Sequence, residues 1–262
     1  NNSIVEETSE EMLLDLDVSS YYPNLSIRNQ FYPKHLSLQF CELYEELYNK
    51  RQKIPKSNPQ NKSLKLLLNS LYGKSGDIYS FVYDKFFQMS ITVNGQLLLT
   101  MLAEQMSFIE GVRVFYANTD GITLKVKKDP ETKRKVYAVW KWWEKLTGLT
   151  LEHTIYKQMV LRDVNNYLAE MEDGTIKHKG AFEIDTEYHK NRSQRIVRIA
   201  VRRYFIDNIP VEKTVKNHLS HGDYGEIENQ GIYDFCLGKK IKSNQRYTLE
   251  NKIERNLPEH KT

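Results

Sequence analysis

The chain has little cysteine, no long apolar run and no low-complexity tract, and each absence narrows the class of protein. Two cysteines, Cys41 and Cys236, are too few and too far apart for a disulfide framework or a thiolate metal site. We therefore expect a reducing compartment. No uninterrupted apolar run approaches the length of a membrane span, and the first residues do not resemble a secretory signal. A cytoplasmic protein with no membrane partner is expected.

The composition is that of a folded protein with a real core. Hydrophobic residues make up 40% of the 262 residues and aromatic residues 11%, including 17 tyrosines. This length is enough for one large domain or for two or three small packed subdomains. The formal net charge of +4 is only mildly basic, so the distribution of charge is more informative than its total.

Hydrophobic periodicity predicts alternating helical and extended segments. Asp120-Gly121 lies between two runs of alternating apolar residues, which is the strongest short hairpin signal. Two helices joined by a loop rich in proline and asparagine predict an antiparallel helix pair over 36–73. The predicted helices span about 36–53, 62–72, 86–109 and 131–146, and the predicted strands span about 12–18, 112–116, 122–126, 151–161, 164–171 and 175–181.

A cation, an amide and a phenol share one face of the second predicted helix. Lys65, Asn69 and Tyr72 stand at i, i+4 and i+7, so they lie along one side of it. Together they are suited to bind a phosphate, a polar edge and a ring or base. Gly73 follows them and permits close approach of another backbone. The opposite side is expected to be buried and carries Leu66, Leu67 and Leu71.

Two carboxylates stand at the ends of predicted strands. If the strands are adjacent, Asp17 and Asp120 come together, and two close negative charges need a cation. Mg²⁺ accepts one or two carboxylates together with substrate phosphates, and a pair of such ions supports phosphoryl transfer. Each residue also has an ordinary explanation, because Asp-Gly is usually only a turn and an aspartate after a strand often begins one. Asp15 has no motif around it.

Three segments, in order along the chain, resemble the motifs of the family B DNA polymerases. The segment from Asp17 to Pro23 is similar to Asp-x-x-Ser-Leu-Tyr-Pro, with Tyr21 in the Leu position. The segment from Lys65 to Gly73 matches Lys-x-x-x-Asn-Ser-x-Tyr-Gly at all five specified residues. The third segment, from Tyr116, is similar to Tyr-x-Asp-Thr-Asp, with Asn118 for the first Asp. The similarity covers about residues 13–205, and its overall style is that of phage enzymes.

The resemblance implies transfer of a nucleotide from a dNTP to the 3′-OH of a DNA primer paired with a template. Asp17, Asp120 and the carbonyl of Val18 would hold two Mg²⁺ ions, with Mn²⁺ as a substitute. The second Asp of the family's triplet is the main metal ligand and is kept here as Asp120, so activity is expected to survive. Asn118 removes one negative charge, so weaker metal affinity is expected. Replisome partners are not identifiable from the sequence, and the compartment implied is the cytoplasm of a bacterial or phage-infected cell.

The resemblance also implies contacts with the nucleotide. Lys65 would bind the triphosphate, and Arg51 would join it from the facing helix, with Lys50 and Lys53 as alternatives. Tyr22 would be the steric gate whose ring fills the position of a ribose 2′-OH. The implied nucleotide contacts are Ser20, Tyr21, Tyr22, Arg51, Lys65, Asn69 and Tyr72.

The DNA contacts come from several segments. Asn165 and Tyr167 stand where the family has a Lys-x-Tyr motif, and Tyr167 would touch the primer-template. Farther on, arginines recur every three or four residues, so they form one stripe on a helix. A stripe of one sign favours the phosphate backbone over a solvated face. The implied DNA contacts are Gly73, Thr119, Asn165, Tyr167, Arg192, Arg195, Arg198 and Arg202.

The fold class implied is α+β. It is a right-hand polymerase with an antiparallel-sheet palm (1–30 and 76–185), short two-helix fingers (31–75) and a mainly helical, incomplete thumb (186–262). Few residues precede Asp17, so we expect no proofreading exonuclease in this chain, which is most simply a piece of a longer polymerase. Two alternatives are an inactive nucleic-acid-binding remnant and a reverse transcriptase. The motif between the two carboxylates disfavours the second.

Overall fold

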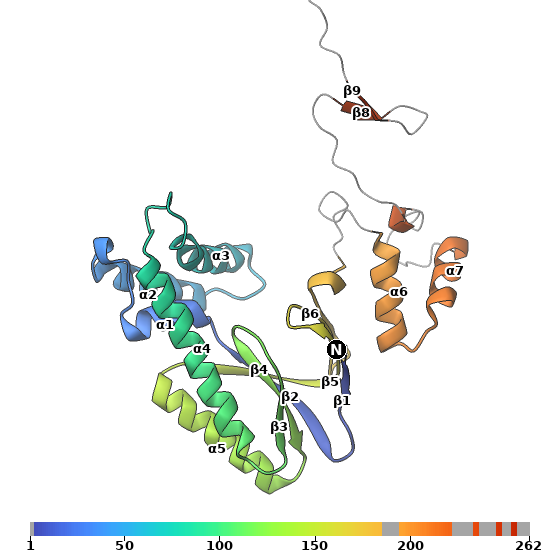
Figure 1. Cartoon of the computed structure of the whole chain (residues 1–262), viewed down its shortest axis with the longest axis horizontal. Coiled ribbons are helices and arrows are strands. Elements are labelled where there is room, and N and C mark those ends of the chain that lie inside the picture. Colours follow the sequence, from blue (N-terminus) through green and yellow to red (C-terminus); the bar gives the residue numbers. More distant parts are fainter. Residues whose placement is uncertain (1–2, 185–193, 222–232, 236–244, 248–252, 256–262) are drawn as a thin grey trace, which may run out of the picture. The chain divides into compact units, whose positions relative to one another are not determined.

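The structure is a computed structural model that describes residues 3–184, 194–221, 233–235, 245–247 and 253–255 (Figure 1). The chain divides into two compact units. Unit 1 consists of Asn1–Asn165 and Ala169–Ile176, and unit 2 consists of Asn166–Leu168 and Lys177–Thr262.

An antiparallel sheet forms the base of unit 1. Its central strand β2 (Glu11–Val18) lies between β4 (Gly121–Lys127) and β5 (Leu151–Asp163). β3 (Val112–Ala117) pairs with β4, and β1 (Ser3–Glu6) pairs with residues 158–161 of β5, beyond the stretch that pairs with β2. All these pairings are antiparallel, as predicted, and the strands belong to a seven-stranded sheet that also includes β6 and β7.

Two long helices cover one face of this sheet (Figure 1). They are α4 (Lys85–Ser107) and α5 (Pro130–Thr147), and each begins after an aspartate whose side chain accepts a backbone N–H. Alternate residues of β2, among them Leu14 and Leu16, enter the core that these helices complete. Asp15 and Asp17 therefore face the other side of the sheet. The sequence predicts these helices well because both have apolar faces of regular period.

Among the described helices, α4 is the one that is long and apolar enough to cross a membrane by length and composition. The search for an uninterrupted apolar run did not predict this. Such a helix is weak support for a membrane span, since core helices pass the same test. In unit 1, Ile91, Leu102 and Met106 of α4 are fully buried in the core.

The remaining helices of unit 1 follow β2 and end at the start of α4. They are α1 (Tyr21–Asn29), the short η1 (Lys34–Leu36), α2 (Gln39–Gln52) and α3 (Pro59–Lys74). The Tyr44 hydroxyl donates to the Leu68 carbonyl at 2.6 Å, and Arg51 Nε donates to Asn61 Oδ1 at 3.2 Å. Residues later in α2 thus contact residues earlier in α3, so the two helices are antiparallel, as predicted.

The structure changes two details of α3. The helix begins at Pro59, earlier than predicted, because the Asn58 side chain accepts the N–H of Gln60 and proline suits the first helical position. Leu66 and Leu67 were expected to be buried, yet they are 69% and 43% exposed. The reason is that α3 packs on α2 through Leu68, which is 1% exposed, and its outer side has no covering element in the described part of the chain.

Unit 2 contains mostly short elements. The strand β6 (Asn166–Met171) crosses the division between the units, and β7 (Ile176–Lys179) and η2 (Gly180–Phe182) follow it. The helix α6 (Arg195–Ile206) packs on α7 (Val211–His221) and buries Ile196, Ile199 and Ala200. The last described elements are η3 (Tyr233–Phe235), β8 (Gln245–Tyr247) and β9 (Ile253–Arg255).

Candidate active site

Two carboxylates stand together at the ends of adjacent strands. Asp17 is near the end of β2 and lies opposite Gly121, the first residue of β4. Asp120 immediately precedes Gly121, and its carbonyl oxygen accepts the N–H of Val18 at 2.7 Å. The predicted neighbourhood of Asp17 and Asp120, at the ends of antiparallel strands, is therefore present. It arises because β2 and β4 pair in a register that buries Leu14 and Leu16 of β2 in the core.

The glycine of the hairpin makes room for the first carboxylate. A Cβ added to Gly121 would lie 2.2 Å from Asp17 Oδ1 and 2.7 Å from the backbone oxygen of Leu16. Gly121 does not have a positive φ, so a special turn conformation is not what requires glycine here. The Asp-Gly signal predicted the hairpin correctly, but the glycine serves the packing of Asp17 against β4.

Asn118, which departs from the family motif, organises the turn. Its Oδ1 accepts the N–H of Gly121 at 2.7 Å and that of Asp120 at 3.1 Å. Its own N–H donates to the Gly121 carbonyl at 3.0 Å. The side chain thus holds the backbone around Asp120. A neutral amide does this as well as a carboxylate would, which explains how the motif tolerates the change structurally.

Asp15 lies two residues before Asp17 and has a different environment. It is 5% exposed, and it accepts hydrogen bonds of 2.6 Å from the hydroxyls of Thr123 and Tyr156. These bonds connect β2 with β4 and β5. A buried carboxylate needs such donors, so Asp15 stabilises the sheet under the site.

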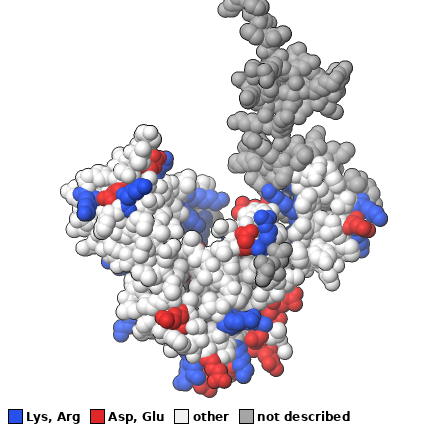
Figure 2. All heavy atoms as spheres, in the orientation of Figure 1, with Lys and Arg blue, Asp and Glu red and all other residues white. Residues whose placement is uncertain are grey.

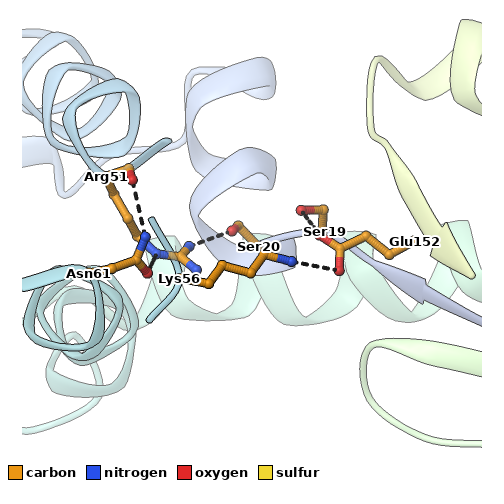
Figure 3. Close-up of polar contacts among 6 residues, drawn as sticks. All are labelled: Ser19, Ser20, Arg51, Lys56, Asn61 and Glu152. Carbon is orange, nitrogen blue, oxygen red and sulfur yellow. Dashed lines mark hydrogen bonds and ion pairs between the residues drawn. The ribbon is translucent and has the colours of Figure 1, made fainter. Parts of the chain in front are cut away.

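The first residues of α1 form the next part of the site. Ser20 has the left-handed backbone conformation (φ 47, ψ 52), which costs a residue with a side chain about 1 kcal/mol or more. Its hydroxyl does not cap α1 but accepts a hydrogen bond from Arg51 Nη1 at 2.9 Å (Figure 3). The strained residue thus connects the end of β2 with the last turn of α2.

The two tyrosines that follow have separate environments. Tyr21 is 4% exposed, and its hydroxyl donates to the Gly95 carbonyl in α4, so in this conformation the hydroxyl is not offered to a ligand. Burial raises the pKa of Tyr21 well above its ordinary value. The ring of Tyr22 stacks on that of Tyr72 with centroids 4.2 Å apart and an interplanar angle of 28°. The pKa of Tyr22 is also raised, first by burial and then by nearby Tyr72 and Asp120, so its phenol is neutral at physiological pH.

Opposite the carboxylates, α2, α3 and the loop between them supply cations. Arg51 is held by Ser20 and by Asn61, and it lines the same cavity as Lys65. The alternatives Lys50 and Lys53 line a separate hollow on α2 together with three glutamates, whereas Arg51 lines the cavity with Lys65. Asn69 lines the cavity on the same side of α3 as Lys65, as their spacing predicted.

One cavity of about 470 Å³ gathers these groups. Its acidic side chains come from the strand ends and its basic side chains come from residues 51–65. The sheet therefore supplies the negative charge of the cavity, and the helix pair with its loop supplies the positive charge. The cavity is lined by Asp17, Val18, Ser19, Ser20, Tyr21, Tyr22, Arg51, Gln52, Lys56, Asn61, Lys62, Lys65, Asn69, Asp120 and Glu152. A polar cavity with carboxylates on one side and cations on the other is suited to a phosphorylated ligand bound with a divalent cation.

Three charged lining residues were missed from the sequence. Lys62 precedes Lys65 by one turn of α3, so the helical spacing would have found it. Glu152 lies directly opposite Asp17 in the pairing of β2 with β5, which only the register of the sheet reveals. Lys56 comes from the loop between the helices, where no periodicity operates, and forms an ion pair with Glu152 at 3.5 Å.

The residues predicted to contact DNA lie in both units. In unit 1, Gly73, Thr119 and Asn165 are exposed. In unit 2, Tyr167 is only 4% exposed, and the Lys177 ammonium lies 5.9 Å from the centre of its ring.

The basic stripe has a mixed outcome. Arg192 lies outside the described residues. Arg195 pairs with Asp234 at 3.0 Å, with side chains only 13% and 4% exposed, so this guanidinium is engaged inside unit 2. Arg198 donates to the Glu183 carbonyl, and Arg202 is partly buried on the same helix. DNA contact by the stripe stays a prediction.

A second charged region of unit 1 has the character of an ordinary solvated surface. Figure 2 shows basic and acidic side chains intermingled at the lower end of the view, near the start of α5. The ion pairs of this part of the chain include Lys125–Glu11, Lys128–Glu7 and Lys135–Glu131. Such mixed pairs contribute little individually and offer no preference for an anion or a cation.

The cavity offers few groups for a tightly held metal. No group of three or more His, Cys, Asp or Glu side chains suited to a metal ion occurs in the described residues. A zinc site with its three or four protein ligands is therefore absent from this part of the chain. Two carboxylates at neighbouring strand ends fit Mg²⁺, because this ion keeps waters and takes further oxygens from substrate phosphates.

The comparisons with known proteins find similarity to solved structures. No protein-family model matches the chain. The chain is similar to the family B DNA polymerase from the hyperthermophilic archaeon Pyrobaculum calidifontis, with 20% sequence identity and a TM-score of 0.49. The similarity covers 83% of this chain and 34% of that polymerase, so the chain spans about a third of its length. The residues around the cavity, and not this similarity, carry the assignment of function.

Proposed function

We propose that the cavity of unit 1 is the nucleotidyl-transfer site of a DNA-directed DNA polymerase. The observation that carries the proposal is the lining of one cavity. Asp17 and Asp120 lie at strand ends, and Arg51 and Lys65 come from the helix pair. These residues lie up to about a hundred positions apart in the sequence, so local structure alone does not bring them together. In this proposal the strands of unit 1 are the palm, and α2 with α3 form the fingers.

The cations would bind the triphosphate of an incoming dNTP. Lys65 and Lys62 lie one turn apart on α3, and Arg51 approaches from α2. The first turn of α3 has no acidic residue, so the positive end of its dipole adds to their charge. Tyr21 and Tyr22, the first residues of α1, line the same cavity, and the N–H groups at a helix start are suited to phosphate oxygens.

The carboxylates would hold the divalent cations. Asp17 and Asp120, with the Val18 carbonyl, would bind Mg²⁺, and Mn²⁺ would substitute. When bound, the ions supply charge neutralisation at the phosphates and acidify the attacking hydroxyl. The chain itself positions the reactants, since the register of β2 and β4 fixes the carboxylates and α3 fixes the triphosphate.

Tyr22 would select the sugar. Its ring lines the cavity and is held against Tyr72, so it cannot swing away without losing the stacking contact. A fixed ring beside the sugar excludes an extra hydroxyl by volume. The phenol is neutral at physiological pH and its pKa is raised further by burial, so no charge is placed beside the triphosphate.

The test is primer extension by Asp120→Asn. We expect the variant to lose extension with Mg²⁺ while its affinity for a primer-template stays within about two-fold, because a metal ligand is removed but no DNA contact. Asp173→Asn is the matched control, since Asp173 is an exposed acceptor for the Thr175 N–H in a turn of unit 1. That variant should extend primers as the wild type does.

The inactive alternative makes a different prediction. If the wild-type protein, supplied with its upstream region, binds a primer-template but extends none with Mg²⁺ or Mn²⁺, a nucleic-acid-binding remnant is favoured. Extension on an RNA template but not on a DNA template would instead favour a reverse transcriptase. Parallel reactions on the two templates therefore separate the three functions.

A further inference from the structure

An ion pair crosses the cavity at a place that no sequence motif marks. Lys56 lies in the loop between α2 and α3, and its Nζ is 3.5 Å from Glu152 Oε2 on β5 (Figure 3). The two side chains are 82% and 56% exposed, and both residues line the cavity. The pair thus joins the helical wall to the sheet wall.

The carboxylate of this pair is held in place from the sheet side. Ser19 Oγ donates to Glu152 Oε1 at 3.0 Å (Figure 3). Glu152 also lies opposite Asp17 in the β2–β5 register, so its backbone position is fixed by the sheet. Lys56, by contrast, has a flexible four-carbon stem on a loop. If the pair separates, Lys56 is therefore the partner that moves.

The two cations nearest this loop are held very differently. Arg51 has hydrogen bonds to the Ser20 hydroxyl and the Asn61 side chain, and it is partly buried. Lys56 has Glu152 as its partner in an exposed ion pair, which contributes little to stability and is easily exchanged. A triphosphate carries several negative charges, so it competes well for an ammonium that a single carboxylate holds weakly.

We propose that Lys56 is a further triphosphate-binding residue, which Glu152 holds at the cavity until the nucleotide arrives. On binding, the ammonium leaves the carboxylate and moves to the phosphates. The role of Lys56 rests on the proposed function for the identity of the nucleotide. Glu152 acts as a positioning residue, because it keeps the ammonium near the cavity but competes with the ligand for it.

The experiment measures binding of inorganic tripolyphosphate to the whole chain by calorimetry, without divalent cations. Glu152→Gln keeps the acceptor for Ser19 but removes the charge, and we expect affinity to rise about two- to five-fold. Lys56→Ala should lower affinity about five-fold. The double variant should match Lys56→Ala, because Glu152 acts through Lys56. Lys135→Ala is the control for loss of an exposed, paired lysine outside the cavity, and it should bind as the wild type does.

Several outcomes would overturn the proposal. If Glu152→Gln raises affinity equally with and without Lys56, the carboxylate merely repels the anion and does not hold the lysine. If Glu152→Gln lowers affinity only when Mg²⁺ is added, Glu152 is a metal ligand instead. Absence of tripolyphosphate binding by the wild type also overturns it. Primer extension is measured separately, so loss of the polymerase assignment is distinguishable from loss of the Lys56 assignment.

Discussion

Gly121 lies opposite Asp17 across β2 and β4, and the Asp17 carboxylate occupies the space that a Cβ at Gly121 would need. The Asp17 carboxylate thus has room because Gly121, the residue next to Asp120, has no side chain. This arrangement couples the two motifs sterically, although they are about a hundred residues apart. It also gives a mutation that disturbs the site without removing any functional group.

Gly121→Ala is expected to displace Asp17. The added Cβ would meet Asp17 Oδ1 at 2.2 Å and the Leu16 carbonyl at 2.7 Å, and the second contact is with backbone that cannot rotate away. Overpacking of this kind costs about 1–3 kcal/mol of the free energy of unfolding. We expect primer extension to be lost in variant protein that is still folded. Denaturant unfolding and extension assays measure the two effects.

Gly73→Ala is the stability control for this variant. A Cβ at Gly73 meets nothing within 4 Å, and the residue lies inside α3, so alanine should raise the free energy of unfolding by about 0.5–1 kcal/mol. Equal stability of Gly121→Ala and wild type would contradict the steric role of Gly121.

Asn118→Asp is expected to change metal dependence but not stability. The carboxylate can accept the same N–H groups of Asp120 and Gly121, so the free energy of unfolding should change by less than about 0.5 kcal/mol. The added negative charge lies beside Asp120 and should lower the Mg²⁺ concentration for half-maximal extension. Asn118→Ala removes the acceptor and should instead destabilise the turn, by about 1 kcal/mol. An unchanged Mg²⁺ requirement in Asn118→Asp would show that the charge at this position is immaterial.

The sequence predicts more of this site than of its surroundings. Asp17, Asp120, Lys65 and Asn69 stand at strand ends or at helical spacing, which predicts where they point, and the resemblance of three segments to polymerase motifs singled them out. Glu152 was missed because its place beside Asp17 depends on the pairing of β2 with β5, whose partners are more than a hundred residues apart. Register of this kind is a tertiary property that one sequence does not encode locally.

Burial was predicted less well than element type. The apolar side of α3 was expected to be covered, but a pair of helices covers only the faces turned toward each other, and Leu66 stays 69% exposed. The stripe on α6 was expected to be free for DNA, yet Arg195 is engaged by Asp234. The periodicity predicted both helices, but it predicted neither which side of α3 packs on α2 nor that Asp234 pairs with Arg195.

Tyr22→Val should raise the ratio of rNTP to dNTP incorporation, because the ring that would exclude the 2′-OH is gone. Tyr22→Phe is the matched control, since it keeps the ring and its stacking on Tyr72. The phenylalanine variant should retain the wild-type ratio. Single-nucleotide incorporation with each sugar measures the ratio. If both variants change it equally, the Tyr22 hydroxyl selects the sugar, and the ring does not.

Arg198 and Arg195 are expected to differ, although both belong to the stripe on α6. Arg195→Ala removes one buried partner of Asp234, which keeps His218 at 3.0 Å, so unit 2 should be destabilised by about 1–3 kcal/mol. Arg198 donates one N–H to the Glu183 carbonyl and has others to offer. If it neutralises a phosphate, Arg198→Ala should flatten the slope of log affinity against log salt by about one, without loss of stability. Primer-template binding at several salt concentrations measures the slope, and an unchanged slope would mean that Arg198 does not contact the DNA backbone.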